Sequence, residues 1–291
     1  MTNQKWSYIR HSNNEFIRSQ SESLPSSYIN PNSIDAWRHL RMHETILPLL
    51  KYYTKSTWMT IGDGNFGSDA NFLIKHGMDV IATSLNDNSL SIAKEGGYIE
   101  KYKVENAENI SFSDSAFDFV FCKEAYHHFP RPPIAFYEML RVSSKGIVLI
   151  EPQESSRKIL NFLKDIFKKW IRKDKTMLFE KSGNFIYKIN IREIEKMMTA
   201  LNYKVVVSKK LNDFYFPKYS GRLANKWSYP LLITKFGCFF QNILGSLNLI
   251  DFGGVCIIAF KDTPPDDLLL QLKRSNFNIH LLPDNPFLNL E

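Results

Sequence analysis

Cysteine is scarce in this chain, and no stretch of the sequence stays apolar for long. The three cysteines, Cys122, Cys238 and Cys256, lie far apart, each inside an apolar run. This spacing excludes a disulfide framework or a cysteine metal site and indicates buried thiols in a reducing compartment. The longest apolar stretch, 229–250, is broken by a proline, a lysine and glycines, so it falls short of a membrane span.

The sequence also contains no internal repeat and no low-complexity tract. The first twenty residues are polar and hold no apolar run of signal-peptide length, so we expect a cytoplasmic protein. With 44% hydrophobic residues in a chain of 291, there is ample material for the core of one large domain or two small ones. The net charge of +7 admits nucleic acid or an anionic membrane surface as a partner.

The segment around which we expect the chain to be organised is 58–77, WMTIGDGNFGSDANFLIKHG. An apolar run typical of a buried strand leads into a turn with three glycines, and apolar residues at helical spacing follow. Glycines let the backbone bend sharply and approach a ligand with no side chain in the way. The glycine turn alone is a weak signal, so a plain glycine turn at a strand end remains an alternative.

Further strands and helices alternate at short intervals, which predicts a parallel sheet with helices on both faces. Ligands of such sheets bind beyond the carboxyl ends of the strands, near the point where the strand order reverses. The predicted strands after the glycine turn are 79–83, 102–104, 117–122, 146–150, 204–208 and 254–261. The predicted helices outside that segment are 33–50, 89–94, 132–141, 191–201 and 266–275.

The helix at 33–50 is expected to cover one edge of the ligand site. It carries Arg38, Arg41 and His43, and one of them would grip an anionic group of a ligand. A solvated helix face is the alternative interpretation of each of these residues.

The segment 157–175 has an apolar stripe at helical spacing and many lysines and arginines on its other face. We favour an inserted helix whose apolar face caps the active site. The alternative is a basic amphipathic helix that lies on an anionic membrane, in a peripheral contact at the inner membrane surface.

The residues after the fourth predicted strand complete a recognisable order of motifs. The glycine turn is followed by a polar turn after the second strand, by Asn106-Ala107-Glu108, and by FDFVFCKEAYHHFPRP at 117–132. This order resembles the class I S-adenosylmethionine-dependent methyltransferases, most closely their small-molecule branch. Within that branch, TIGDGNFGSDA and CKEAYHHFPRP resemble a bacterial group often encoded with surface-polysaccharide biosynthesis genes. The resemblance covers about residues 33–152, and the rest only by topology.

The resemblance implies an α/β, Rossmann-like, doubly wound sheet of seven strands, mostly parallel, with the last strand, 254–261, antiparallel. We treat the chain, 1–291, as a single methyltransferase domain made of five consecutive parts. These are an N-terminal arm and cover helix at 1–55, a cofactor-binding half at 56–152, a basic amphipathic insertion at 153–188, the second half of the sheet at 189–262 and a C-terminal extension at 263–291.

The family pattern also implies roles for single residues in binding the cofactor, S-adenosylmethionine. Gly62, Asp63 and Gly64 would line its methionine end. Ser84 stands where an acid normally binds both ribose hydroxyls, so either Asp87 reaches back or Ser84 and Asn86 serve as neutral partners.

For the remaining cofactor contacts, Leu85 would pack against the adenine, Asn106 would bond its amino group, and Ala107 would give a backbone contact. Lys123 and Glu124 would border the sulfonium and the methionine tail. The pattern departs from the family at Thr60, where many relatives carry an acid that orients the glycine turn.

The implied chemistry is direct displacement at an electrophilic methyl carbon, and a hydroxyl acceptor must also lose its proton. Histidine has the right pKa for that proton, and His127 and His128 follow the fourth strand, where the acceptor should lie. We expect one of them to be the base, with His127 ahead; packing against the backbone is the alternative. Tyr126 would be a wall or hydrogen-bond partner. No metal site is expected, since the histidine pair lacks a carboxylate at ligand spacing.

The leading hypothesis is therefore an S-adenosylmethionine-dependent methyltransferase that O-methylates a small polar acceptor, such as a sugar of a surface glycan. RNA or DNA methylation is one alternative, which the positive charge favours. Against it, the chain has no Asn-Pro-Pro-Tyr-type tetrad after the fourth strand and no appended nucleic-acid module. A catalytically inactive cofactor-binding subunit is a second alternative, because Ser84 and Thr60 depart from the family pattern.

Overall fold

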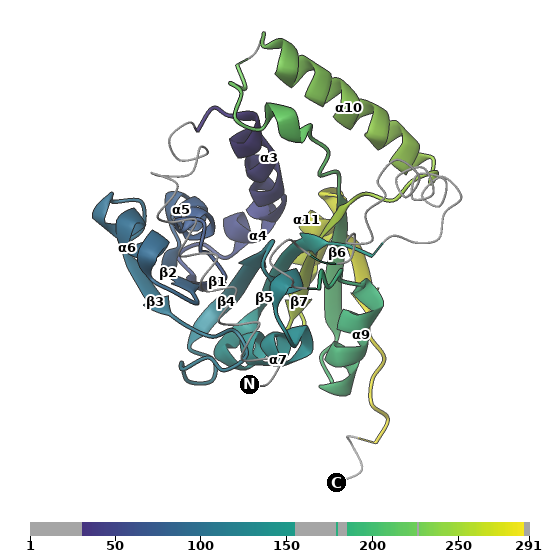
Figure 1. Ribbon diagram of the computed structural model, residues 1–291. Coiled ribbons are helices and arrows are strands. Elements are labelled where there is room, and N and C mark those ends of the chain that lie inside the picture. Colours follow the sequence, from purple (N-terminus) through teal and green to yellow (C-terminus); the bar gives the residue numbers. More distant parts are fainter. Residues whose placement is uncertain (1–30, 155–178, 180–184, 226, 288–291) are drawn as a thin grey trace.

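The computed structural model describes residues 31–154, 179, 185–225 and 227–287. In these ranges the chain forms one twisted mixed sheet with helices on both faces (Figure 1). The predicted basic helix at 157–175 lies outside the described residues, as does most of the N-terminal arm.

The sheet has eight strands in the order β3-β2-β1-β4-β5-β7-β6-β8. Strands β1 to β5 run parallel, and β7 is antiparallel to both of its neighbours, β5 and β6. The strand order reverses between β1 and β4, which places the switch point beside the glycine turn. The strand bounds are β1 Thr57–Ile61, β2 Asp79–Ser84, β3 Lys101–Val104, β4 Phe117–Lys123, β5 Ser143–Pro152, β6 Val205–Leu211, β7 Gly254–Phe260 and β8 Asn278–Leu281.

The mostly parallel sheet and the antiparallel β7 were both predicted, but the number of strands was wrong. The strand β8 pairs antiparallel with the outer edge of β6, beyond the strand predicted to be last. Its four residues are too few for the alternation of polar and apolar residues to stand out. The chain reverses direction at Asn276, whose φ is 63°, and this turn brings it from the helix at 266–274 back onto the sheet.

The helices follow the predicted positions with two differences. The predicted helix at 33–50 is divided by a 3-10 turn just before Pro48, because proline has no amide hydrogen to continue the helix. The helix α10, Tyr229–Ser246, was not predicted as a helix, because its proline and glycines seemed to break it. Pro230 lies in its first turn, where the missing amide hydrogen costs nothing. The other helices are α3 Ile34–His43, η1 Glu44–Ile46, α4 Leu47–Tyr52, α5 Ser68–Lys75, α6 Asn88–Glu95, η2 Tyr126–His128, α7 Pro132–Val142, α9 Ile191–Ala200, η3 Pro217–Tyr219 and α11 Asp266–Arg274.

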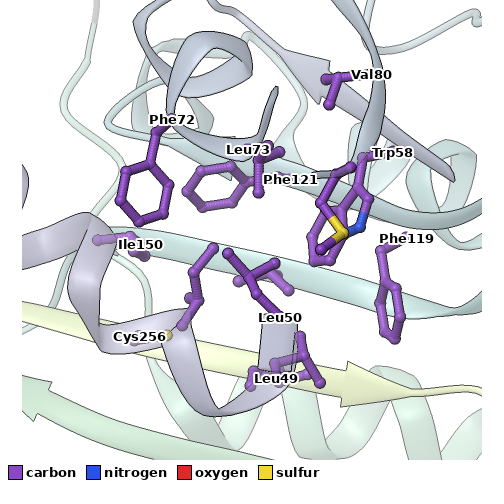
Figure 2. Packing of buried hydrophobic residues seen from close by; sticks show 14 of the residues in the cluster. Leu49, Leu50, Trp58, Phe72, Leu73, Val80, Phe119, Phe121, Ile150 and Cys256 are labelled. Atoms are coloured by element: carbon purple, nitrogen blue, oxygen red, sulfur yellow. The ribbon is translucent and has the colours of Figure 1, made fainter. Parts of the chain in front are cut away.

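Hydrophobic side chains fill the space on both faces of the sheet, because neighbouring strand residues point to opposite sides. On one face, Trp58, Phe119 and Phe121 pack against Leu49 and Leu73 of the covering helices (Figure 2). On the other face the strands pack against α7 and α9. Cys122, Cys238 and Cys256 are all buried free thiols, as predicted.

Because β1, β4 and β5 are parallel neighbours, the residues that follow them meet at one edge of the sheet. Helix α3 crosses this edge (Figure 1). Within the described part of the chain, no helix is both long and apolar enough to span a membrane.

Candidate active site

The glycine turn follows β1 and lies directly against the segment that follows β4. Gly62 has a φ of +70°, and a Cβ atom placed on it would lie 2.4 Å from the Cβ of Ala125. Gly67, the third glycine of the turn, also adopts a left-handed conformation, with a φ of 67°, as does Phe66 before it, with a φ of 56°. The turn at 62–67, GDGNFG, therefore has the glycine spacing of the dinucleotide fingerprint, and only glycine fits at Gly62.

Asp63 holds the turn in place. Its buried carboxylate accepts hydrogen bonds from the amides of Asp69 and Ala70 in the first turn of α5 and from the hydroxyl of Thr60. These amides are unsatisfied within the helix itself, so the carboxylate caps α5. The acid that the family pattern places at Thr60 is thus replaced by an acid three residues later, which bonds Thr60. The side chain of Asp63 therefore points toward α5.

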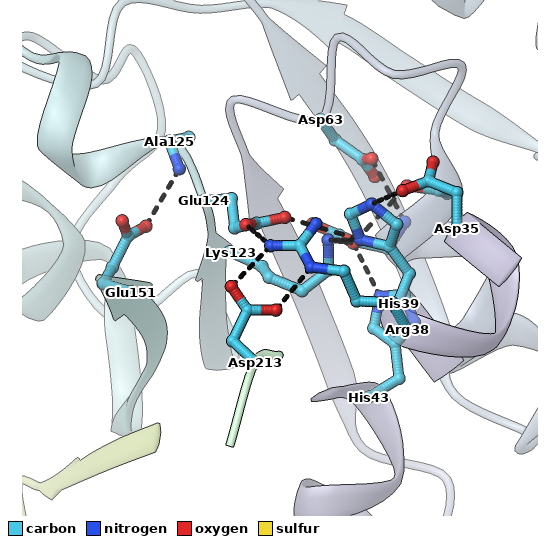
Figure 3. A network of polar contacts seen from close by, with 12 residues as sticks. Asp35, Arg38, His39, His43, Asp63, Lys123, Glu124, Ala125, Glu151 and Asp213 are labelled. Carbon is cyan, nitrogen blue, oxygen red and sulfur yellow. Dashed lines mark hydrogen bonds and ion pairs between the residues drawn. The ribbon is translucent and has the colours of Figure 1, made fainter. Parts of the chain in front are cut away.

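Lys123, the last residue of β4, is buried and ion-paired. Its Nζ lies 3.1 Å from Oδ1 of Asp69 and 3.2 Å from Nδ1 of His39 (Figure 3). Asp69 also lies 2.7 Å from Nε2 of His43. Burial alone would raise the pKa of Asp69, but the charge of Lys123 and the bond to His43 outweigh it and hold the pKa below its usual range.

Glu124 connects the end of β4 to the helix that crosses it. It has a φ of 51°, and its Oε1 lies 2.5 Å from Nη2 of Arg38. The same guanidinium binds both carboxylate oxygens of Asp213, which follows β6, and stacks over Tyr215. Burial opposes ionisation of Glu124, but Lys123 and Arg38 outweigh it and lower its pKa to about 2. Acidic side chains that follow β4 and β6 therefore face α3 (Figure 3).

The interpretation of α3 as a solvated face is wrong for Arg38 and His43, which are both buried in these ion pairs. Arg41 is bonded to the carbonyl oxygen of Asn212 and lies 3.2 Å from the sulfur of Cys238. All three side chains thus bind other parts of the protein and fix α3 over the carboxyl ends of the strands.

This arrangement predicts a loss of stability in mild acid. Burial and the Lys123 charge lower the pKa of His39 from 6.5 to about 3, so unfolding takes up a proton between these pH values. The free energy of unfolding of the ligand-free protein should fall by about 1.4 kcal/mol per pH unit for this proton as the pH drops below 6.5. Urea denaturation across this range measures the slope.

The variant His39→Gln should flatten that slope by about one proton, because glutamine does not titrate. The control is the variant His76→Gln, because His76, at the C-terminal end of α5, does not belong to this network. If the unaltered protein and the His39→Gln variant have the same slope, the assignment of this proton to His39 is wrong.

The residues predicted to hold the ribose and adenine lie at the carboxyl ends of β2 and β3. Ser84 ends β2 and is buried, Leu85 is half-buried, and Asp87 is exposed at the start of α6. The Oδ1 atom of Asn106 already accepts from the amide of Glu108, so an adenine amino group would be its second donor. Ala107 is buried beside it. The two alternatives for the ribose partner both stay predictions.

His127 is oriented by a carboxylate that the sequence analysis did not single out. Glu151, near the end of β5, is fully buried, and its Oε2 lies 2.7 Å from Nδ1 of His127. Its other oxygen accepts from the backbone amide of Ala125 (Figure 3) and from that of Tyr126. Because a carboxylate accepts, Nδ1 carries the hydrogen, and the basic nitrogen of the neutral ring is Nε2. The ring of His128 lies beside that of His127, with ring centroids 3.8 Å apart and a tilt of 44° between the ring planes.

The structure therefore brings together Gly62, Lys123, Glu124 and His127 at one edge, and it adds Asp69, Glu151 and Asp213. Glu151 could have been found from the rule that parallel strands end at the same edge, since β5 neighbours β4. Asp213 had no such signal, because it follows β6, which lies three positions from β4 in the sheet.

The residues at the carboxyl ends of β1 to β4 suit a ligand that has cationic groups and an adenosine. The turn backbone at Gly62 and Gly64 is partly exposed, whereas the flanking Asp63 and Phe66 are buried. The ionised Glu124 follows β4 at the contact between Gly62 and Ala125, and it suits an ammonium or sulfonium. Polar groups at the ends of β2 and β3 suit hydroxyls and a base.

Comparison with known proteins gives one match to a family model. Residues 59–150 match the model described as a methyltransferase domain. No curated protein matches the chain.

Several solved structures share the fold. The YcgJ protein of Bacillus subtilis superposes with a TM-score of 0.50 at 16% identity, over 76% of this chain and 100% of that one. A methyltransferase dependent on S-adenosylmethionine from Thermotoga maritima gives 0.50 at 16% identity, over 88% and 100%. A phosphoethanolamine N-methyltransferase of Haemonchus contortus, solved with S-adenosylhomocysteine, gives 0.47 at 16% identity, over 76% and 52%. The first two likenesses describe the fold alone.

Proposed function

We propose that the protein transfers the methyl group of S-adenosylmethionine to a hydroxyl of a small polar acceptor. The match of residues 59–150 to a methyltransferase-domain model and the shared fold support this proposal. A sugar of a surface glycan is the acceptor we favour. The observation that carries the proposal is the contact between Gly62 and Ala125, because it joins the predicted cofactor turn to the segment that carries His127.

The binding residues would be those at the ends of the first four strands. The turn at Gly62 and Gly64 offers backbone groups to the methionine end, and Glu124 offers an ionised carboxylate to a cationic group. Ser84, Leu85, Asn106 and Ala107 would hold the nucleoside. When bound, S-adenosylmethionine supplies a methyl carbon made electrophilic by its positive sulfur.

The protein itself would supply orientation and a base. Glu151 fixes the tautomer of His127, so that Nε2 can accept the proton of the acceptor hydroxyl as the oxygen–methyl bond forms. The positive charge that the ring gains is stabilised by the carboxylate behind it. Tyr126, buried beside Tyr187, would form a wall of the acceptor site. His127 is the base we favour, because Glu151 orients its ring.

The segment 157–175 stays part of this proposal as the inserted cap, with a peripheral membrane contact as its alternative. Both fit an acceptor that is linked to a lipid carrier.

The acceptor can be tested by incubating the protein with methyl-labelled S-adenosylmethionine and one of three pools. These are nucleotide sugars, lipid-linked glycans and total RNA. We expect label in one of the glycan pools, in a linkage stable to mild base, as an O-methyl ether is. Label that enters RNA and is released by ribonuclease would favour the nucleic-acid alternative instead.

A further inference from the structure

The helix α10 presents an apolar face to solvent that the proposed chemistry does not use. Figure 1 shows it standing away from the sheet, beyond α3. Only Leu231, Thr234 and Cys238 of its residues are buried. A helix in this position would normally be polar on its outer side.

The inner side of α10 is fitted to the protein and is not a mobile tail. A Cβ atom on Gly237 would lie 2.1 Å from Phe214, and one on Gly245 would lie 2.3 Å from Phe252. The two glycines are two helical turns apart, so they form one face that receives both rings. The amide of Asn212 also donates to the carbonyl oxygen of Cys238. The helix is therefore held in one orientation.

The outer side is a stripe of large apolar residues. Phe236 is 70% exposed and Phe239 is 62% exposed, and Trp227, just before the helix, is 83% exposed. Spacings of three, four and seven residues place the stripe on one side of the helix. The exposed members between 227 and 249 are Trp227, Tyr229, Leu232, Phe236, Phe239, Phe240, Ile243, Leu247 and Leu249. A contiguous apolar surface of this kind marks a docking site.

The charge around the stripe indicates the kind of partner. Between Phe214 and Ile250 the sequence contains four basic residues and neither aspartate nor glutamate. One of them, Lys235, is exposed on α10. A second copy of the chain would bring two such segments together with no carboxylate to offset them. An anionic surface offsets the charge, and aromatic residues beside lysine are typical of helices that lie at a lipid interface.

We propose that the outer face of α10 docks on the surface of an anionic lipid bilayer, with the helix lying along it. The docking surface is continuous with the candidate site through the segment before α10. Asp213 of that segment binds Arg38, and the amide of Ile34 at the start of α3 donates to the carbonyl oxygen of Arg222 at 2.9 Å. Docking would thus hold the cover helix and its site near the membrane surface.

The test is sedimentation with lipid vesicles. The full chain should bind vesicles of mixed phosphatidylglycerol and phosphatidylcholine more tightly than vesicles of phosphatidylcholine alone. The triple variant Phe236→Ser, Phe239→Ser, Phe240→Ser should bind the mixed vesicles at least about tenfold more weakly. Lys235→Gln should weaken binding about fivefold.

The control variant carries the same kind of change on exposed apolar residues elsewhere, namely Tyr137→Ser, Leu201→Ser and Leu270→Ser. It should bind vesicles like the unaltered chain. The three α10 phenylalanines are exposed, so circular dichroism and the affinity for S-adenosylhomocysteine should be unchanged. This second readout separates a failure of docking from a failure of the proposed function.

Two outcomes would overturn the inference. One is vesicle binding that the α10 triple variant leaves intact, which would place any membrane contact in another segment, such as 157–175. The other is a dimer, seen by light scattering, that the same variant dissociates.

Discussion

The variant His127→Asn is expected to lower kcat for methyl transfer by about 10²- to 10⁴-fold, with little change in the affinity for S-adenosylhomocysteine. The asparagine amide can still donate toward Glu151 from the position of Nδ1, which lies 2.7 Å from Oε2. What it lacks is a basic nitrogen at the position of Nε2. Single-turnover rates with a labelled methyl donor measure the chemical step, and calorimetric titration measures the affinity.

Two further variants make this prediction specific. His128→Asn should change kcat by less than about threefold, because the carboxylate at the end of β5 orients His127. Glu151→Gln should lower kcat by about 10²-fold, because an amide does not enforce the Nδ1–H tautomer. A loss in His128→Asn that equals or exceeds the loss in His127→Asn would contradict the assignment of the base.

The substitution Gly62→Ala is expected to have the largest effect on cofactor binding and stability. A left-handed φ costs a non-glycine residue about 1 kcal/mol. The added Cβ would also lie 2.4 Å from Ala125, and overpacking of this kind costs about 1–3 kcal/mol more. The free energy of unfolding should therefore fall by about 2–4 kcal/mol. Affinity for S-adenosylhomocysteine should be lost as the turn moves away from β4.

Gly77 provides the matched control. It also has a left-handed φ, of +83°, but no heavy atom lies within 4 Å of the position that a Cβ would take. Gly77→Ala should therefore cost only about 1 kcal/mol and leave affinity unchanged. Urea denaturation of both variants separates backbone strain from the contact with Ala125. Equal losses of stability in the two variants would show that this contact is unimportant.

The parts of the fold that the sequence predicted are those with a strong local pattern. The strand before Gly62, the turn itself and the helix after it are consecutive, so their residue types alone indicate them. The antiparallel β7 was also predicted, from the resemblance. The strand β8 was missed because its four residues depend on pairing with the edge of β6, which is a tertiary interaction.

In the candidate site, sequence could propose residues but not their partners. Lys123 and Glu124 were placed correctly at the end of β4, but nothing local indicates that one pairs with Asp69 and the other with Arg38. Asp213 binds Arg38 across 175 residues of chain, so only the folded topology brings them together. The role of Asp63 in lining the cofactor with its backbone stays a prediction. Its side chain caps α5, because buried helix amides need an acceptor, and the sequence did not indicate this role.

The central claim is that S-adenosylmethionine binds along the glycine turn, with its methyl group facing Tyr126 and His127. The most direct test is a crystal structure of the protein soaked with S-adenosylhomocysteine. The account predicts the ligand's methionine end beside Gly62 and Gly64, its adenine near Asn106 and its sulfur facing His127. A cavity filled by side chains, or adenosine bound elsewhere on the protein, would contradict it.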